Sequence, residues 1–288
     1  MSQNTQQKEL MSYDQALAIF SESPKSEQHC AEAEFGYKYM LEAVRMLGKK
    51  SRILEVGSGS GLLLSRLGRE FPESHFTGLE PMGDGFTYNP VMYEFIDSLP
   101  NASIKPVGYE ALSSSEKFDL IFLVNVFEHL PDWKDFMKAI KTLLNPDGKC
   151  IILCPNYSFP YEPHFRLPIF LNKSLTRSIF RKSILSYEIR EDAKGLWKSL
   201  NFVKLRHVKA SAKMLDLKID MRKDILAEMV GRLKSDPEFA SRQKLLKLPI
   251  FLLEKFGLIK LLLTAKIFEN FLPYMHLNIT HKIQNERQ

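Results

Sequence analysis

The chain has 288 residues, of which 44% are hydrophobic and 26% are charged, as is ordinary for a globular protein with a sizeable core rather than a disordered chain. Its net charge of +6 hides an asymmetry: residues 1–164 carry 15 Lys and Arg against 22 Asp and Glu, whereas residues 165–288 carry 25 against 12. The basic part indicates an anionic partner such as phospholipid, a phosphorylated glycan or RNA, or simply a solvated surface.

The N-terminus and the cysteines bear on the cellular location. The N-terminus does not show the charged start and apolar core of a signal peptide. The three cysteines, Cys30, Cys150 and Cys154, are few and odd in number. A reducing cytosol suits such a chain, so we expect a cytoplasmic protein. Cys150 and Cys154 share one face of a predicted strand and are expected to be core thiols.

Two helical patterns, near residues 13–20 and 27–47, predict an N-terminal helical cap over residues 1–50. Residues 51–210 then alternate between strand and helix patterns. This alternation predicts an α/β fold, a doubly wound Rossmann-like sheet with helices on both faces, whose ligands bind beyond the C-terminal strand ends. The predicted strands cover residues 52–56, 74–80, 103–107, 118–124 and 149–154.

The composition of the sequence changes after Pro155, because residues 156–168 are rich in proline and aromatic residues. The part that follows is mostly helical in pattern, and residues 211–288 are expected to form a helical, basic and apolar C-terminal extension. Its predicted elements are helices at 171–186, 187–200 and 214–235 and a strand at 202–209.

Residues 245–273 are the most apolar stretch of the chain. Charged residues interrupt the stretch too often for a membrane span, and its apolar side chains surround most of the helical circumference. Three interpretations stay open: a cap packed on the core, a segment that dips into the membrane interface, and a subunit contact. The interrupting residues are Glu254, Lys255, Lys260, Lys266 and Glu269.

A glycine-rich turn follows the first predicted strand, with Gly57, Gly59 and Gly61 in G-x-G-x-G spacing. Glycine is needed where φ is positive or where a side chain would strike a ligand. A dinucleotide usually requires G-x-G-x-x-G, whereas S-adenosylmethionine has an ammonium that needs an acceptor and a ribose diol. Glu55, just before the glycines, and Glu80, at the end of the second predicted strand, suit the ammonium and the diol respectively.

Five motifs, in the same order along the chain, resemble those of the class I S-adenosylmethionine-dependent methyltransferases. The resemblance covers roughly residues 30–210 and is to the branch that includes small-molecule and ubiquinone-biosynthesis enzymes. The resemblance implies that the cofactor is S-adenosylmethionine. The motifs are Glu55–Gly61, Glu80, Phe118–Ile121, Glu128–Asp132 and Leu144–Lys149.

The resemblance also implies roles for single residues. Glu80 would hold the ribose, Pro81 and Met82 would flank the adenine, and Tyr109 with Glu110 would reach its edge, although this pair departs from the small residue and acid that the family often has there. The remaining implied cofactor residues are Glu55, Gly57, Ser58, Gly59 and Gly61 around the methionine end, and Asn125 and Val126 along the methyl-transfer face.

A hydroxyl acceptor must lose its proton during methyl transfer, so an active-site base indicates an O-methyltransferase. His129 and His164 are the candidates, with Glu128 beside them, because both loops follow strand ends. His129 could instead only shape its loop. Asn156, Tyr161 and Glu162, in the proline-bracketed aromatic segment, are candidate substrate contacts.

A metal site is not expected here. Related ubiquinone-biosynthesis and small-RNA enzymes have a Glu-x-x-Glu-His run that can bind a divalent cation, but Asn125 replaces the first Glu, and Asn is a weaker ligand for a hard cation. The segment from Asn156 to Phe165, with Leu167 and Pro168, resembles a branch of these enzymes associated with lipid, quinone or cell-surface glycan pathways. Our hypothesis is O-methylation of a lipid, quinone-like or glycan-linked small molecule.

Two rival functions stay open. One is a metal-assisted RNA 2′-O-methyltransferase, although no nucleic-acid recognition motif supports an RNA partner. The other is a non-catalytic subunit that binds the cofactor and supports a partner enzyme. A lipid-linked acceptor would suit peripheral association with a membrane through residues 245–273, and the sequence does not indicate the oligomeric state.

Overall fold

The computed structural model describes residues 12–23, 25–81, 90–222, 225–242, 244–258, 261 and 266–282. The chain divides into two compact units: the first holds the described residues up to Val107, and the second begins at Gly108. This division falls inside the expected domain 51–210, so the domain boundaries read from the sequence stay predictions.

The first unit contains three parallel strands in the order β3-β2-β1. Their register pairs Ile53 with Phe76, and Phe76 in turn with Ala102. Residues 53–56 of β1 are all buried, as expected for a strand covered on both faces. The strands are β1 (Arg52–Val56), β2 (His75–Leu79) and β3 (Ala102–Lys105).

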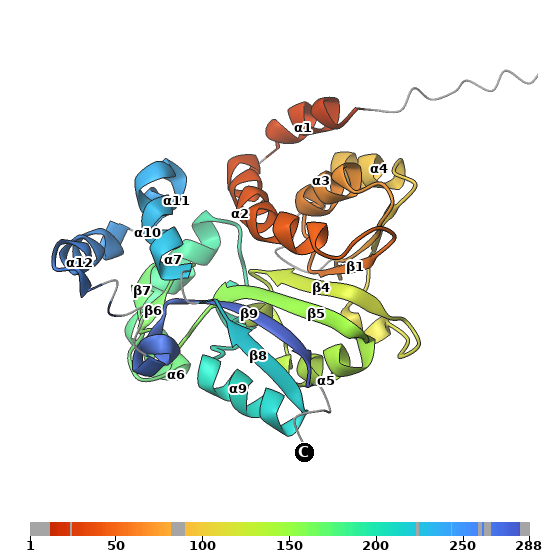
Figure 1. Ribbon diagram of the computed structural model, residues 1–288. Helices are drawn as coiled ribbons and strands as arrows, with labels where there is room; N and C mark the ends of the chain where they lie inside the picture. Colours follow the sequence, from red (N-terminus) through yellow and green to blue (C-terminus); the bar gives the residue numbers. More distant parts are fainter. Residues whose placement is uncertain are drawn as a thin grey trace, which may run out of the picture. The chain divides into compact units, whose positions relative to one another are not determined.

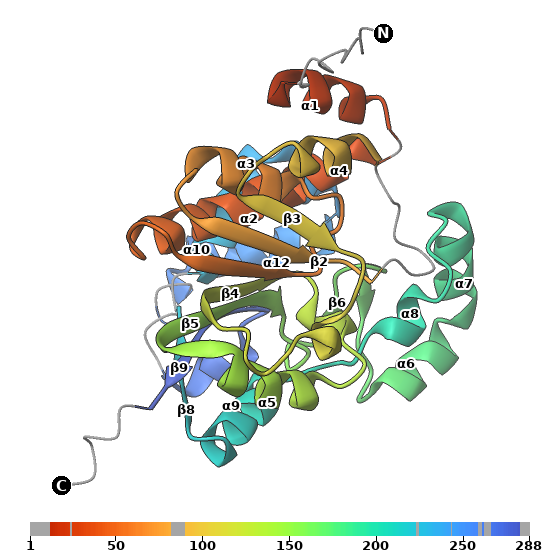
Figure 2. The same ribbon diagram turned by 90° about the vertical axis from the view of Figure 1, so that its right-hand side faces the viewer.

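The helices of the first unit pack over this sheet and over one another (Figure 2). A capping box starts the first helix, because the Ser12 side chain accepts from the Gln15 amide while the Gln15 side chain accepts from the Ser12 amide. Phe20, Met92 and Phe95 join the first and fourth helices in one apolar cluster. The helices are α1 (Tyr13–Ser21), α2 (Ser26–Arg45), α3 (Leu62–Glu70) and α4 (Pro90–Asp97).

The second unit contains four strands in the order β4-β5-β9-β8 (Figure 1). β4 and β5 are parallel, whereas β9 runs antiparallel to both β5 and β8. The helices α5 and α9 lie beside this sheet, and the Asp132 side chain caps α5 by accepting from the amides of Lys134 and Asp135. The strands are β4 (Phe118–Val124), β5 (Leu144–Pro155), β8 (Leu217–Met221) and β9 (Tyr274–His281).

Helices and a short hairpin complete the second unit. The hairpin pairs Tyr161 with Pro168 and Glu162 with Leu167. Its strands are β6 (Tyr161–Glu162) and β7 (Leu167–Pro168), and the helices are α5 (Trp133–Leu143), α6 (Lys173–Ile179), α7 (Arg181–Arg190), α8 (Leu196–Ser199), α9 (Leu205–Met214), α10 (Ile225–Ser235), α11 (Pro237–Arg242) and α12 (Lys244–Lys255), with 3-10 turns η1 (Tyr109–Ala111), η2 (Phe127–His129) and η3 (Lys266–Phe271).

The α/β fold expected from the sequence is confirmed, with local corrections in the C-terminal part. The strand expected at 202–209 is a loop followed by α9, whose buried residues Leu205, Val208 and Ala212 recur at helical spacing. The charged helix expected at 214–235 is β8 followed by α10. Residues 211–288 also return to the sheet as β9, which inserts between β5 and β8.

Membrane crossing can be judged for the part of the chain that the structure describes. Within that part, no helix is both long enough and apolar enough to span a bilayer. The apolar stretch 245–273 lies partly outside the described residues; its described part forms α12, η3 and the connection into β9.

Candidate active site

The glycine turn of the first unit follows β1 and leads into α3. Gly57, Gly59 and Gly61 have φ angles of 74°, 52° and 77°, which explains why glycine occupies each position. A Cβ on Gly61 would lie 2.5 Å from Ile96 Cδ1. The Gly57 amide donates to Leu79 O at 2.8 Å, which attaches the turn to the end of β2. The turn is therefore a fixed cradle of bare backbone.

Two buried acids flank this turn, as the sequence predicted. Glu80 accepts a hydrogen bond from the Gly59 amide at 2.8 Å. Glu55 Oε2 is buried and has no hydrogen-bond partner among the described residues. Burial raises the pKa of Glu55 well above its usual value, and the neighbouring Glu80 raises it further. A cation such as the ammonium of S-adenosylmethionine would relieve this unfavourable placement, so the residues fit that cofactor.

Sequence reasoning missed one residue that holds the turn. The Tyr93 hydroxyl, on α4, donates to Gly59 O at 2.9 Å. The contact spans 34 positions, so no local pattern could have indicated it. Gly78 of β2 also leaves room for the turn, since a Cβ there would lie 2.8 Å from Ser58 Oγ.

The residues expected around the adenine are less well defined. Pro81 is exposed, and Met82 lies outside the described residues. Tyr109 is buried, with its ring against Phe136 at a centroid distance of 5.0 Å and its hydroxyl donating to Asp132 O at 3.3 Å. Packing accounts for Tyr109, and its role at the adenine edge, like that of exposed Glu110, stays a prediction.

In the second unit, Asn125 stands at the end of β4 in a left-handed conformation, with φ of 55°. Its backbone amide donates a hydrogen bond to Leu153 O at 2.8 Å, and its side-chain oxygen accepts a hydrogen bond from the Tyr274 hydroxyl at 2.6 Å. Tyr274 begins β9, a strand that the sequence analysis did not predict. Val126 precedes η2, and its carbonyl accepts from the His129 amide at 2.8 Å.

Glu162 fixes the orientation of His164. The carboxylate is fully buried and lies 2.6 Å from His164 Nδ1. It also accepts from the Tyr157 hydroxyl at 3.2 Å and from the Phe165 amide at 2.7 Å. Because a carboxylate can only accept, Nδ1 of His164 carries the proton and the lone pair is on Nε2. Glu162, expected to contact substrate, therefore lies behind the imidazole as its positioning residue.

His129 is fixed by a comparable contact. Its Nδ1 lies 2.9 Å from Ser199 Oγ, and that hydroxyl donates its single proton to Leu196 O at 2.8 Å. Ser199 can then only accept from His129, so the lone pair of His129 is on Nε2 as well. Burial, with additional effects of His164 and Lys173, lowers the pKa of His129 to about 3. This imidazole is therefore neutral at physiological pH.

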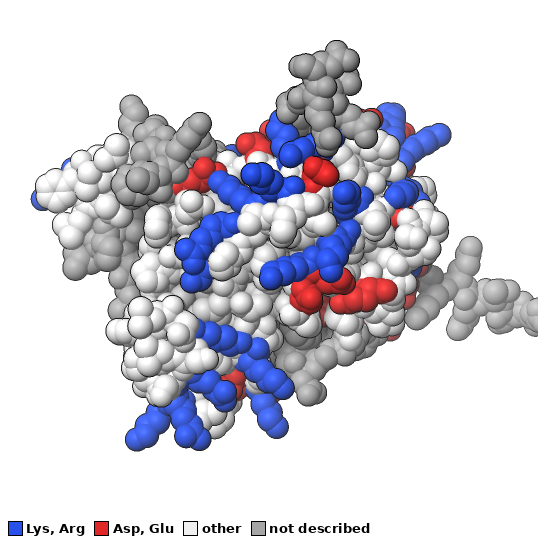
Figure 3. All heavy atoms as spheres, turned by 90° about the horizontal axis from the view of Figure 1, so that it is seen from below, with Lys and Arg blue, Asp and Glu red and all other residues white. Residues whose placement is uncertain are grey.

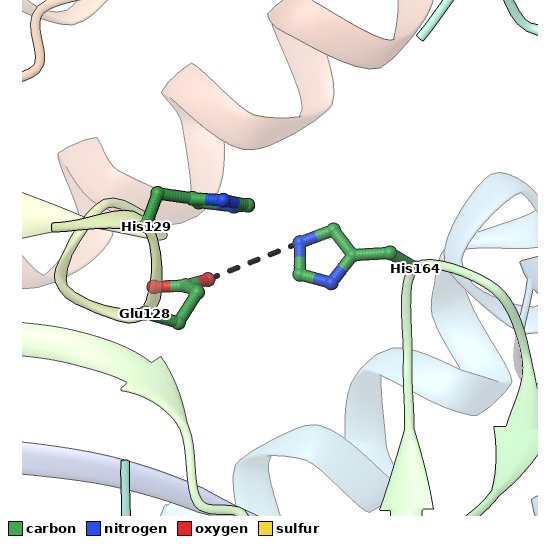
Figure 4. A group of neighbouring side chains, drawn as sticks. All are labelled: Glu128, His129 and His164. Carbon is green, nitrogen blue, oxygen red and sulfur yellow. Dashed lines mark ion pairs between the residues drawn. The ribbon is translucent and has the colours of Figure 1, made fainter. Parts of the chain in front are cut away.

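Glu128 completes the cluster with His129 and His164 (Figure 4). It is fully buried, and its Oε1 lies 3.9 Å from His164 Nε2. The two imidazole rings meet edge to face with centroids 5.1 Å apart. One ligand atom from each of the three residues lies within 4.8 Å of the others. Two imidazoles and a carboxyl group converge here, an arrangement that can accept a proton or hold a cation.

Asn201, which sequence reasoning missed, holds the loop that carries Glu128. Its side-chain amide donates to Phe127 O at 2.8 Å and to Leu130 O at 3.1 Å, while its backbone amide donates to Glu128 O. The contacts lie more than 70 positions apart, beyond any local signal.

The expected substrate contact Asn156 needs correction. Its Nδ2 donates to Asn270 O and Leu272 O, and its Oδ1 accepts from the amides of Ser158 and Leu205. These four bonds use the full capacity of the carboxamide and give it a structural role. Tyr161 differs, because its buried hydroxyl has no hydrogen-bond partner among the described residues.

Comparison with known proteins agrees with this geometry. A methyltransferase-domain family model matches residues 32–208. An uncharacterized protein of Mycobacterium tuberculosis, Rv1509, is 35% identical over 216 residues, which cover 74% of this chain and 73% of that protein. A ubiquinone biosynthesis O-methyltransferase of Aeromonas salmonicida is 27% identical over 138 residues, covering 42% of this chain and 53% of that enzyme.

A solved structure of the mycolic acid cyclopropane synthase CmaA1, complexed with S-adenosylhomocysteine, aligns with 81% of this chain and 79% of its own, at 16% identity and a TM-score of 0.46. The chain belongs to the class I S-adenosylmethionine-dependent methyltransferases, and its cofactor is S-adenosylmethionine.

Replacement of Glu80 tests the expected cofactor site of the first unit. Glu80→Ala removes the anchor of the Gly59 amide and the expected acceptor for the ribose hydroxyls, so we expect at least about tenfold weaker binding of S-adenosylmethionine by calorimetry. Glu73→Ala, which removes an exposed acid of the same unit, should leave the affinity unchanged. Equal affinity for both variants would contradict the assignment.

The lowered pKa of His129 predicts acid sensitivity. Since its pKa is about 3 in the folded chain against 6.5 ordinarily, the unfolded chain binds the extra proton, and stability falls as the pH drops below about 7. The loss of unfolding free energy between pH 7 and pH 5 is at most about 2 kcal/mol, because the ring is partly exposed to solvent. Urea denaturation of His129→Gln at pH 7 and 5 should show a smaller loss than the parent chain. His75→Gln, an exposed control, should behave like the parent.

Proposed function

We propose that this methyltransferase transfers a methyl group to a hydroxyl of a small or lipid-linked acceptor, with His164 as the general base. The observation that carries the proposal is the 2.6 Å contact between Glu162 and His164 Nδ1, which leaves Nε2 as the only basic atom of that ring. Neutral imidazole is the usual proton acceptor near neutral pH.

The proposed methyl transfer moves one methyl group and one proton. When bound, the cofactor supplies a methyl group on a positively charged sulfur, and breaking of the carbon–sulfur bond leaves its electron pair on sulfur. His164 Nε2 takes the acceptor's hydroxyl proton as the oxygen forms its bond to the methyl carbon. The Glu162 carboxylate stabilises the resulting imidazolium through Nδ1, as a buried carboxylate does in hydrolase triads.

Other residues of the second unit would position the acceptor. The unpartnered hydroxyl of Tyr161 is available to an acceptor polar group, and burial and Glu162 raise its pKa to about 12, so that it would act as a donor rather than a base. Asn125 and Tyr274 form a second polar pair at the end of β4. The relative named as a ubiquinone biosynthesis O-methyltransferase supports a hydroxyl acceptor.

Paired variants separate the base from its positioning residue. His164→Ala should reduce methyl transfer about 10²-fold or more while leaving S-adenosylmethionine affinity unchanged. Glu162→Gln should lower turnover less and shift the acidic limb of the pH–rate profile to lower pH, because the imidazolium loses its carboxylate partner. Extracts incubated with methyl-labelled cofactor provide the acceptor, and mass spectrometry follows the product. A His164→Ala variant with full turnover would exclude the general-base role.

A divalent cation is the second candidate for activating the hydroxyl, although we did not expect one because Asn125 replaces an acid. Glu128, His129 and His164 offer ligand atoms within 4.8 Å of one another. Both imidazoles also have an oxygen partner at Nδ1, as metal-binding histidines usually do. A cation would occupy the His164 Nε2 lone pair, so the two mechanisms exclude each other.

Titration with Co²⁺ separates these mechanisms. If a cation acts here, calorimetry and visible absorption should show one bound Co²⁺ that Glu128→Gln removes and His75→Gln retains, and chelators should abolish turnover. The proposed general base requires the opposite result: turnover that survives chelation.

The remaining rivals are separated by the product. Labelled RNA would favour the RNA methyltransferase, and a chain that binds S-adenosylmethionine but forms no S-adenosylhomocysteine with any extract would favour the non-catalytic subunit. A membrane contact through residues 245–273 remains a proposal, supported by the exposed side chains of Phe251 and Phe256 on and just after α12.

A further inference from the structure

The segment that follows His164 has an unusual charge pattern. Residues 163–187 contain five Lys and Arg and no Asp or Glu. Three of these basic residues, Arg177, Arg181 and Lys182, are exposed on α6 and α7. Lys and Arg side chains lie among uncharged residues on the face of the second unit that includes α6 and α9 (Figure 3). Acids occur only at the far end of α7, at Glu188 and just beyond it at Glu191 and Asp192, so the part of this surface before them carries net positive charge.

The same two helices expose apolar side chains at helical spacing. Leu175 and Ile179 are exposed four residues apart on α6, and Leu185 and Ile189 are exposed four residues apart on α7. On each helix one neighbouring position is buried, Thr176 on α6 and Ile184 on α7. Each helix is thus anchored on one side and leaves an apolar row exposed beside it.

The connection before α6 adds two more exposed apolar residues. Phe170 is exposed, and Leu171 is 85% exposed in a left-handed conformation with φ of 55°. A positive φ is uncommon for leucine, whereas glycine and asparagine adopt it with less strain. Ile189, at the far end of α7, is 82% exposed. We call Phe170, Leu171, Leu175, Ile179, Leu185 and Ile189 the apolar surface of α6 and α7.

We propose that the apolar surface of α6 and α7, with Arg177, Arg181 and Lys182, docks on an anionic lipid bilayer. Large aliphatic and aromatic side chains enter the interface, and neighbouring basic residues bind acidic head groups, which is the combination that holds peripheral helices on membranes. The positive charge favours a bilayer over a second copy of the same surface, because two such surfaces would repel each other.

This surface has a fixed position relative to His164. Phe165, the next residue, packs against Tyr187 of α7 at 4.9 Å and against Trp197 of α8 at 5.3 Å between ring centroids. Lys173 of α6 donates to Lys198 O at 2.9 Å, beside Ser199, the partner of His129. The hairpin, α6, α7 and α8 also lie together in Figure 2. Docking through α6 and α7 would therefore hold the two histidines at a set distance from the bilayer.

Vesicle flotation of the full chain tests this proposal without an acceptor, so its outcome is independent of the proposed chemistry. The parent should float with phosphatidylcholine–phosphatidylglycerol vesicles, less with phosphatidylcholine alone, and less at high salt. Leu171→Ser/Ile189→Ser should lose most of the bound fraction. Arg181→Glu/Lys182→Glu should bind at least about 25-fold more weakly, since each basic residue contributes about fivefold and glutamate adds repulsion from the acidic head groups.

Two matched variants make the test specific. Lys138→Glu/Lys141→Glu changes the charge equally on α5 and should float like the parent. Phe251→Ser/Phe256→Ser changes the other exposed apolar segment and should retain most of the binding. Loss of flotation only in the Phe251 and Phe256 variant would overturn the proposal in favour of residues 245–273.

Two further outcomes would also overturn it. One is a parent that does not float. The other is a parent that is dimeric by light scattering and becomes monomeric in Leu171→Ser/Ile189→Ser, since the surface would then join two copies. Unchanged thermal denaturation of the variants would show that each remains folded, as expected for exposed positions.

Discussion

The histidine cluster of the second unit depends on one buried contact, the hydrogen bond between Glu162 and His164 Nδ1. A fully buried carboxylate is costly unless its oxygens are paired. Glu162 meets this requirement with Tyr157, the Phe165 amide and His164 together. The same contacts that stabilise the acid fix the imidazole, so the hairpin cannot satisfy Glu162 without presenting Nε2 of His164 to Glu128 and His129.

The glycine turn of the first unit follows a different principle, since it is made chiefly of backbone. Glycines with positive φ form the turn, and the end of β2 accepts hydrogen bonds from the turn's amides. Its two acids are buried, and burial raises the pKa of both. The free chain therefore holds Glu55 in a place that disfavours its charge, and a cationic ligand is the natural means of relieving it.

Much of this could be predicted from sequence, because the strand–turn–helix motif, Glu55 and Glu80 are local signals. The continuous apolar run of β4 likewise predicted a buried strand. What the sequence could not indicate was tertiary pairing. Tyr93, Asn201 and Tyr274 act on residues 34 to 149 positions away. β9 was missed because residues 211–288 were interpreted as a helical extension, and Asn156 looked accessible although the backbone uses its whole carboxamide.

The exposed surface of α6 and α7 and the buried histidine cluster belong to one continuous segment of chain. His164 is the proposed base, and the basic segment after it supplies most of the surface that would meet a lipid. Aromatic packing of Phe165 against Tyr187 and Trp197 links the two. A lipid-linked acceptor would explain why a catalytic loop continues directly into an exposed apolar surface.

The most direct test of the central claim is the protonation of the His164 ring, measured by long-range ¹H–¹⁵N NMR of imidazole-labelled protein. The account predicts a protonated Nδ1 and an unprotonated Nε2 at neutral pH, with this preference lost in Glu162→Gln. A proton on Nε2 in the parent chain would contradict it, because His164 would then have no lone pair with which to accept the proton of a hydroxyl.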